Sequence, residues 1–184
     1  MTLDILAFGA HPDDVELGCG GTIALSVSQG KSAGIIDLTQ GEMGTRGSVE
    51  LRKEEAEKSK AILKVNIREN LAFRDGFFIN DEVHQRAVIQ KIRAYRPEIV
   101  FCNAIDDRHS DHAKSSALVR DACFLSGLLK IETQDTSGGL QESWRPNAVY
   151  SYIQWKNITP DFVVDISSTI DVKMASVAAF ASQF

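Results

Sequence analysis

Two short segments of the chain carry the residue types that hold metal ions and move protons. The first reads His-Pro-Asp-Asp at positions 11–14, and the second reads Asp-Asp-Arg-His-Ser-Asp-His at positions 106–112. Imidazole nitrogens and carboxylate oxygens are ligands of catalytic zinc, which usually has three protein ligands and an open position for water. His11, Asp14 and His112 are therefore predicted to bind a divalent cation.

Asp13 would lie beside that water without binding the metal, which is the position of a general base. Each segment by itself is weak evidence, because Asp and Pro are common in surface turns. If the two segments converge, three imidazoles and three carboxylates crowd together, and such a cluster repels itself or requires protonation unless a cation is bound. Convergence therefore favours a metal site over two solvated turns.

The segments that must position these residues alternate between strand and helix patterns. Strands are predicted at 3–10, 33–39, 70–73, 99–102, 148–152 and 162–165, and helices at 21–29, 49–63, 80–96, 112–129 and from 169 onward. Such alternation predicts an α/β fold, a Rossmann-like three-layer sandwich with a mostly parallel sheet. In the sheet order 3-2-1-4-5, the two motif-bearing strands are neighbours, and ligands bind in the crevice at their carboxyl ends.

The composition limits the partners of the chain. It has 184 residues, enough for one domain, with 25 Asp and Glu against 20 Lys and Arg, a net charge of -5. An acidic balance argues against nucleic acid or an anionic membrane as the main partner, and we expect neither. We see no bilayer-spanning apolar run and no secretory signal. Three widely spaced cysteines predict reduced thiols and a cytoplasmic protein.

A glycine-rich segment, Gly-Cys-Gly-Gly at 18–21, invites comparison with a dinucleotide-binding fingerprint, and Asp37 could imitate its ribose-binding acid. The turn after the first strand does not read G-x-G-x-x-G, however, and Asp13, Asp14 and Glu16 would place negative charge where a pyrophosphate binds. We therefore reject nucleotide binding. The glycines are expected to permit close backbone approach, and Asp37 to cap or hydrogen-bond locally.

The large aromatic side chains are assigned to packing. Trp144, Trp155 and the pair Phe77 and Phe78 are predicted to lie in the core or at an interface rather than to stack on a ligand. Cys19, although close to the first motif, is predicted to be a small packing residue.

The chain resembles the PIG-L/LmbE-type zinc-dependent N-acetylglucosaminyl deacetylases, and in particular the bacterial branch that deacetylates N-acetylglucosaminyl-malate during bacillithiol synthesis. The motifs that carry the resemblance lie at 10–22, 39–47 and 107–112. By this resemblance His11, Asp14 and His112 are the zinc ligands, and Asp13 is the general base.

The resemblance also implies roles for four further residues. His109 would be a second catalytic group oriented by Asp111, and the protonated imidazole would stabilise the oxyanion. Arg52 and Arg108 would hold the substrate, with the malate carboxylates as partners of their planar guanidinium groups.

The expected reaction is hydrolysis of the N-acetyl group of an N-acetylglucosamine conjugate, giving an amine and acetate. N-acetylglucosaminyl-L-malate is the favoured substrate, and another N-acetylglucosamine conjugate or oligosaccharide is the alternative. The expected cofactor is one Zn²⁺ per chain, with Fe²⁺ possible. Residues 1–184 are expected to form a single deacetylase domain without the C-terminal part usual in the family, within a homo-oligomer (trimer or hexamer) as in relatives.

Two other classes of protein remain open at this point. Two His and one carboxylate also suit the Fe(II) of a non-heme oxygenase, although such a site needs no Asp beside its water. A non-catalytic metal-binding subunit is the other alternative.

Overall fold

Five short apolar segments form the strands of one parallel sheet, in the order β3-β2-β1-β4-β5. The computed structural model describes all 184 residues. The strands are β1 (Ile5–Gly9), β2 (Ala33–Thr39), β3 (Ile67–Phe73), β4 (Ile99–Cys102) and β5 (Ala148–Ser151). This confirms the predicted α/β class and the predicted strand order.

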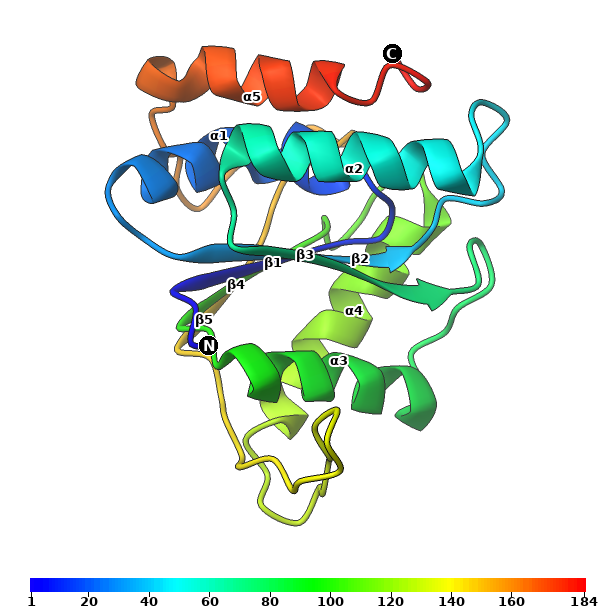
Figure 1. Cartoon of the computed structure of the whole chain (residues 1–184), viewed down its shortest axis with the longest axis vertical. Coiled ribbons are helices and arrows are strands. Elements are labelled where there is room, and N and C mark those ends of the chain that lie inside the picture. Colours follow the sequence, from blue (N-terminus) through cyan, green and yellow to red (C-terminus); the bar gives the residue numbers. More distant parts are fainter.

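Helices cover both faces of the sheet (Figure 1). They are α1 (Asp14–Ser28), α2 (Val49–Leu63), α3 (Glu82–Tyr95), α4 (Ser110–Leu125), α5 (Ile170–Ala178) and the 3-10 helix η1 (Ser167–Thr169). α1 and α2 lie on one face, with α5 on their outer side, and α3 and α4 lie on the other face. The layers are those of a three-layer sandwich with an additional helix on one side.

Each face of the sheet has its own apolar core. Along β1, Ile5 and Ala7 belong to the core under α1, whereas Leu6 and Phe8 belong to the core over α3 and α4. Successive side chains of a strand point to opposite faces, so every residue of β1 is buried. The strand therefore has no solvated face. The polar residues of the first motif follow only beyond its carboxyl end.

α1 begins at Asp14, seven residues earlier than predicted, and Gly18 and Gly21 lie inside it. A Cβ at Gly18 would stand 2.3 Å from the Tyr152 ring, and one at Gly21 would stand 2.4 Å from the Ile166 side chain. Glycine weakens a helix by about 1 kcal/mol relative to alanine. Here the close packing of Tyr152 and Ile166 on α1 outweighs the low helix propensity of glycine. The expected close approach to the backbone at these glycines is confirmed.

The predicted strand at 162–165 is wrong: these residues belong to no strand. Val163 is 81% exposed and Phe162 is 53% exposed. β-branched residues favour extended backbone, but a strand forms only when a neighbouring strand offers hydrogen bonds.

Of the predicted core or interface positions of the aromatic residues, the core is confirmed for Phe78 and Trp144. Phe78 is buried in the core, and Trp144 packs against the same core. The indole N–H of Trp144 donates to the Pro97 carbonyl oxygen at 2.8 Å. Phe77 and Trp155 are instead 58% and 68% exposed, so they are not core residues.

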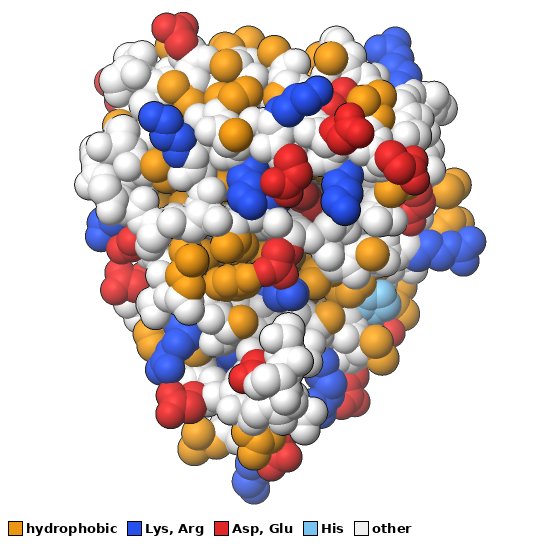
Figure 2. Space-filling view, viewed as in Figure 1, with side chains coloured by type: hydrophobic (Ala, Val, Ile, Leu, Met, Phe, Trp, Pro, Cys, Tyr) orange, Lys and Arg blue, Asp and Glu red, His pale blue; other side chains and the backbone are white.

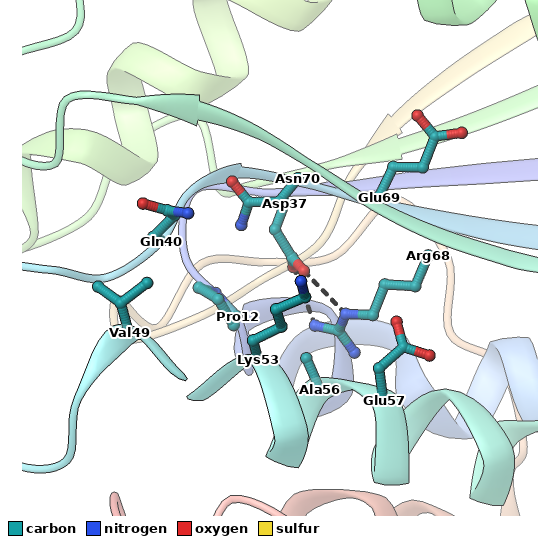
Figure 3. A pocket seen from close by; sticks show the side chains of 10 residues that line it. All are labelled: Pro12, Asp37, Gln40, Val49, Lys53, Ala56, Glu57, Arg68, Glu69 and Asn70. Atoms are coloured by element: carbon teal, nitrogen blue, oxygen red, sulfur yellow. Dashed lines mark hydrogen bonds and ion pairs between the residues drawn. The ribbon is translucent and has the colours of Figure 1, made fainter. Parts of the chain in front are cut away.

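A buried charge cluster ties the first turn of α1 to β2 and β3. The Arg68 guanidinium donates to both oxygens of Asp37, at 2.8 and 2.9 Å, and also to Glu16. Asp37 thus pairs with a residue 31 positions away, and the expected local contact is wrong. This pair lines a hollow of about 410 Å³. Figure 3 shows Lys53 and Glu57 of α2 beside the pair.

The face over α2, β3 and α3 carries side chains of both charges in close alternation (Figure 2). Local ion pairs join some of them: Lys91 lies 2.6 Å from Glu69, and Arg86 lies 2.8 Å from Glu82.

None of the helices is both long and apolar enough to cross a bilayer.

Arg68→Met is expected to lower the free energy of unfolding by about 3–5 kcal/mol, because two buried carboxylates lose their counter-charge. The matched control is Arg86→Met, which removes an exposed arginine and should change stability by less than about 1 kcal/mol. Urea unfolding of both variants measures the difference. Equal losses of unfolding free energy in the two variants would show that the buried ion pairs of Arg68 contribute no more than an exposed arginine.

Candidate metal centre

The two motif segments leave the carboxyl ends of the neighbouring strands β1 and β4, and their side chains meet. The ring centroids of His11 and His112 are 5.6 Å apart. Asp14 lies between them, with one carboxylate oxygen 3.1 Å from His112 Nε2 and the other 3.5 Å from His11 Nδ1. The three predicted metal ligands are thus brought together, although 101 positions separate the first from the last.

The Asp14 carboxylate is held by neutral groups as well. Its Oδ2 accepts hydrogen bonds from the His11 backbone N–H at 2.9 Å and from Asn103 Nδ2 at 3.0 Å. Its Oδ1 accepts one from Gln154 Nε2 at 3.0 Å. Neither amide was among the predicted site residues. Asn103 directly follows β4, so its position at a strand end was a usable signal, whereas no motif marks Gln154.

A second set of carboxylates surrounds His11. Its Nε2 lies 3.1 Å from Asp75 Oδ1 and 3.7 Å from Asp111 Oδ2. Asp75 follows β3 and was also missed. The other oxygen of Asp75 accepts a hydrogen bond from the Met43 backbone N–H at 3.0 Å, which connects the loop between β2 and α2 to the site.

The charges of the site fit a divalent cation. Burial by itself lowers the pKa of His11, but contacts with Asp111, Asp14 and Asp75 outweigh burial and raise it to about 12. Three carboxylates around one imidazole therefore demand a positive charge. His11, His109 and His112 each offer a nitrogen within 4.8 Å of the others. Imidazole and carboxylate donors of this kind suit Zn²⁺ or Fe²⁺.

Asp13 is the N-cap residue of α1 and has an unusual backbone conformation. Its φ is 118°, a region that costs non-glycine residues about 1–3 kcal/mol and that concentrates at functional sites. Burial and the Asp14 charge raise the pKa of Asp13 to about 7, against the opposing effect of Arg52. Asp13 is thus a half-buried carboxylate able to exchange a proton near neutral pH.

Arg52 is buried rather than turned to solvent, with 5% of its surface exposed. Its guanidinium donates to the Pro12 carbonyl at 2.5 Å and to Asp13 Oδ2 at 3.2 Å. Gly41, at φ +67°, leaves the space for this group, because a Cβ there would stand 2.1 Å from Arg52 Nη1. The predicted substrate arginine therefore already has partners within the protein.

His109 and Asp111 do not form the expected side-chain pair. His109 Nδ1 accepts the backbone N–H of Asp111 at 3.3 Å. The Asp111 carboxylate instead accepts hydrogen bonds from the Gly76 N–H at 2.7 Å and from Lys114 Nζ at 3.0 Å. Because Asp111 lies inside the first turn of α4 and is fully buried, its carboxylate faces His11 and not the exposed His109.

Arg108 lies at the rim of the site and is exposed. Its guanidinium carbon stands 4.3 Å from the centroid of the Trp155 ring. No carboxylate of the chain pairs with it, so its hydrogen-bond donors face solvent.

Fold and site together define an α/β protein with a candidate metal centre at the carboxyl ends of its two central strands. Residues 6–123 match the PIG-L family, described as GlcNAc-PI de-N-acetylase. The chain belongs to this family of deacetylases.

Three relatives illustrate the likeness. The diacetylchitobiose deacetylase of Thermococcus kodakarensis is 31% identical, over 98% of this chain and 70% of the relative. The conserved protein TT1542 from Thermus thermophilus is 39% identical with a TM-score of 0.92, over 100% of this chain and 80% of the relative. The N,N'-diacetylchitobiose deacetylase of Pyrococcus horikoshii is 26% identical with a TM-score of 0.86, over 98% and 70%.

His11→Ala is expected to abolish stoichiometric binding of zinc, because it removes a nitrogen donor from the middle of the carboxylate cluster. His84→Ala is the matched control, since His84 lies on α3 and contacts Asp81 and Phe73. Metal content after dialysis, by elemental analysis, compares the two. One zinc per chain retained in His11→Ala would remove His11 from the ligand set.

Proposed function

We propose that this chain hydrolyses the N-acetyl group of an N-acetylglucosamine conjugate at a zinc ion held by His11, Asp14 and His112. The observation that carries the proposal is the meeting of these three side chains beside Asp13, in a chain of the PIG-L deacetylase family. Fe²⁺ is the alternative metal for the same donors.

The residues divide the chemistry among them. A divalent cation, when bound, supplies polarisation of the acetyl carbonyl and a water of lowered pKa. Asp13, whose Oδ2 accepts a hydrogen bond from Arg52, accepts the proton of the attacking water. The same carboxyl group, or His109 at the rim, then donates a proton to the departing amine.

We propose that Arg52 is a positioning residue that acts through Asp13 rather than a substrate ligand. Its buried hydrogen bonds to Asp13 and Pro12 hold the strained turn before α1. Arg108 remains the proposed substrate arginine, because its donors are exposed and lack an internal carboxylate partner.

We propose N-acetylglucosaminyl-L-malate as the substrate, with the malate carboxylates bound by Arg108. The sequence resemblance and the unpaired guanidinium support this choice. The two relatives named for diacetylchitobiose support the alternative, an N-acetylglucosamine oligosaccharide. We further propose a cytoplasmic homo-oligomer, a trimer or hexamer; the location is inferred from the three free cysteines.

Acetate release is expected from N-acetylglucosaminyl-L-malate, and more slowly from diacetylchitobiose and free N-acetylglucosamine. A chelator should abolish acetate release, because the acetyl carbonyl would lose its polarising cation. Added Zn²⁺ or Fe²⁺ should restore acetate release. Enzymatic quantification of acetate measures all three substrates. A chain that binds stoichiometric zinc but releases no acetate would instead be a non-catalytic metal-binding subunit.

Asp13→Ala is expected to retain zinc but to lower kcat at least about a hundredfold, the usual contribution of a general base. Asp106→Ala is the control, because Asp106 is an exposed carboxylate of the same rim that pairs with Lys156. Steady-state kinetics with measured zinc content separate loss of the base from loss of the metal. Near-normal turnover in Asp13→Ala would exclude the assigned role.

A further inference from the structure

An exposed tryptophan is fastened to the rim of the candidate metal centre. The Trp155 side chain is 68% exposed, although its backbone N–H donates to Asp107 Oδ2 at 2.8 Å. The other oxygen of Asp107 lies 3.1 Å from His112 Nδ1. The preceding residue, Gln154, donates to Asp14. The backbone of Trp155 is thus placed by two contacts that lead directly to proposed metal ligands, while its ring stays in solvent.

The ring of Trp155 has one backed face and one open face. The Arg108 guanidinium lies 4.3 Å from its centroid, and the exposed fraction shows that the remaining surface is accessible. A cation held over an aromatic face contributes about 0.5–1 kcal/mol at exposed sites and orients the ring. The ring thus lies between the Arg108 guanidinium and solvent, on a backbone that is tied to the centre through Asp107.

Arginine over an exposed aromatic ring does not by itself mark a site. Phe124 is 58% exposed and has Arg145 at 4.4 Å from its ring, yet it lies near the end of α4. Phe124 is 14 positions after Ser110, so at 1.5 Å per residue it lies about 21 Å along α4 from the first residue of the helix, near which His112 lies. Trp155 differs in its attachment to the centre.

We propose that the open face of Trp155 binds a pyranose ring of the substrate, next to the N-acetyl group that is hydrolysed. This rests on the proposed function and adds a saccharide subsite to it. The C–H groups on one face of a pyranose form an apolar surface that packs against an aromatic ring, and burial of both removes apolar area from water. Because the Trp155 backbone is already held by Asp107, little backbone freedom is lost on binding.

Binding can be measured separately from turnover. In an Asp13→Ala/Trp144→Phe background loaded with zinc, Trp155 is the only tryptophan. Titration with diacetylchitobiose and with methyl N-acetylglucosaminide is expected to change its emission saturably. By calorimetry in the Asp13→Ala background, Trp155→Ala should weaken binding of either saccharide about tenfold. Trp155→Phe, which keeps a flat ring, should stay within about threefold, and Phe124→Ala should not change the affinity.

Kinetics provide the second measurement. Trp155→Ala in the otherwise unaltered protein should raise KM for the sugar substrates about tenfold with kcat within about twofold, and should leave KM for N-acetylethanolamine, which has no ring, unchanged. Equal saccharide affinity in Trp155→Ala and Phe124→Ala, or no response of Trp155 emission, would overturn the subsite. If no substrate releases acetate, the proposed function fails, while the binding measurements still decide the subsite.

Discussion

The site depends on one buried amide between the carboxyl ends of β1 and β4. Asn103 is fully buried, and its Oδ1 accepts hydrogen bonds from the Ala10 N–H at 2.9 Å and from Ser115 Oγ at 2.7 Å. Its Nδ2 donates to Asp14 at 3.0 Å. One side chain thus joins the end of β1, the first turn of α1 and the interior of α4. A buried amide pays a large desolvation penalty unless its hydrogen bonds are made, so these elements are held in a single arrangement.

The molecule handles two buried groups of carboxylates in different ways. Asp37 and Glu16 share the permanently charged Arg68, which makes that cluster a structural link between α1 and the sheet. At the candidate metal centre, the carboxylates of Asp14 and Asp75 face imidazoles, whose protons can be replaced by a metal ion. The first arrangement is closed, because guanidinium cannot lose its charge under ordinary conditions. In the second arrangement, the imidazole protons can be exchanged for a metal ion, as a metal centre requires.

Local signals predicted the parts of the fold that local physics controls. The bounds of β2, α2 and β4 agree with prediction, and Ser48 caps α2 by accepting the Leu51 N–H at 3.2 Å. The start of α1 was missed because the glycines at 18–21 weaken the helix pattern, while the packing that requires them comes from Tyr152 and beyond. The strand at 162–165 failed for the opposite reason, since its propensity was present but its partner strand was not.

The types of chemistry at the site were determined by the sequence alone: the motif His-Pro-Asp-Asp, the second motif at 106–112, and a strand order that makes their strands neighbours. Only the tertiary structure decided which groups complete the site. Asp75, Asn103 and Gln154 arrive from strand ends without a recognisable motif, and burial turns Arg52 onto Asp13 instead of toward solvent. Spacing along the chain controls contacts within a turn or a helix, whereas contacts between strand ends depend on how the whole sheet and its helices pack.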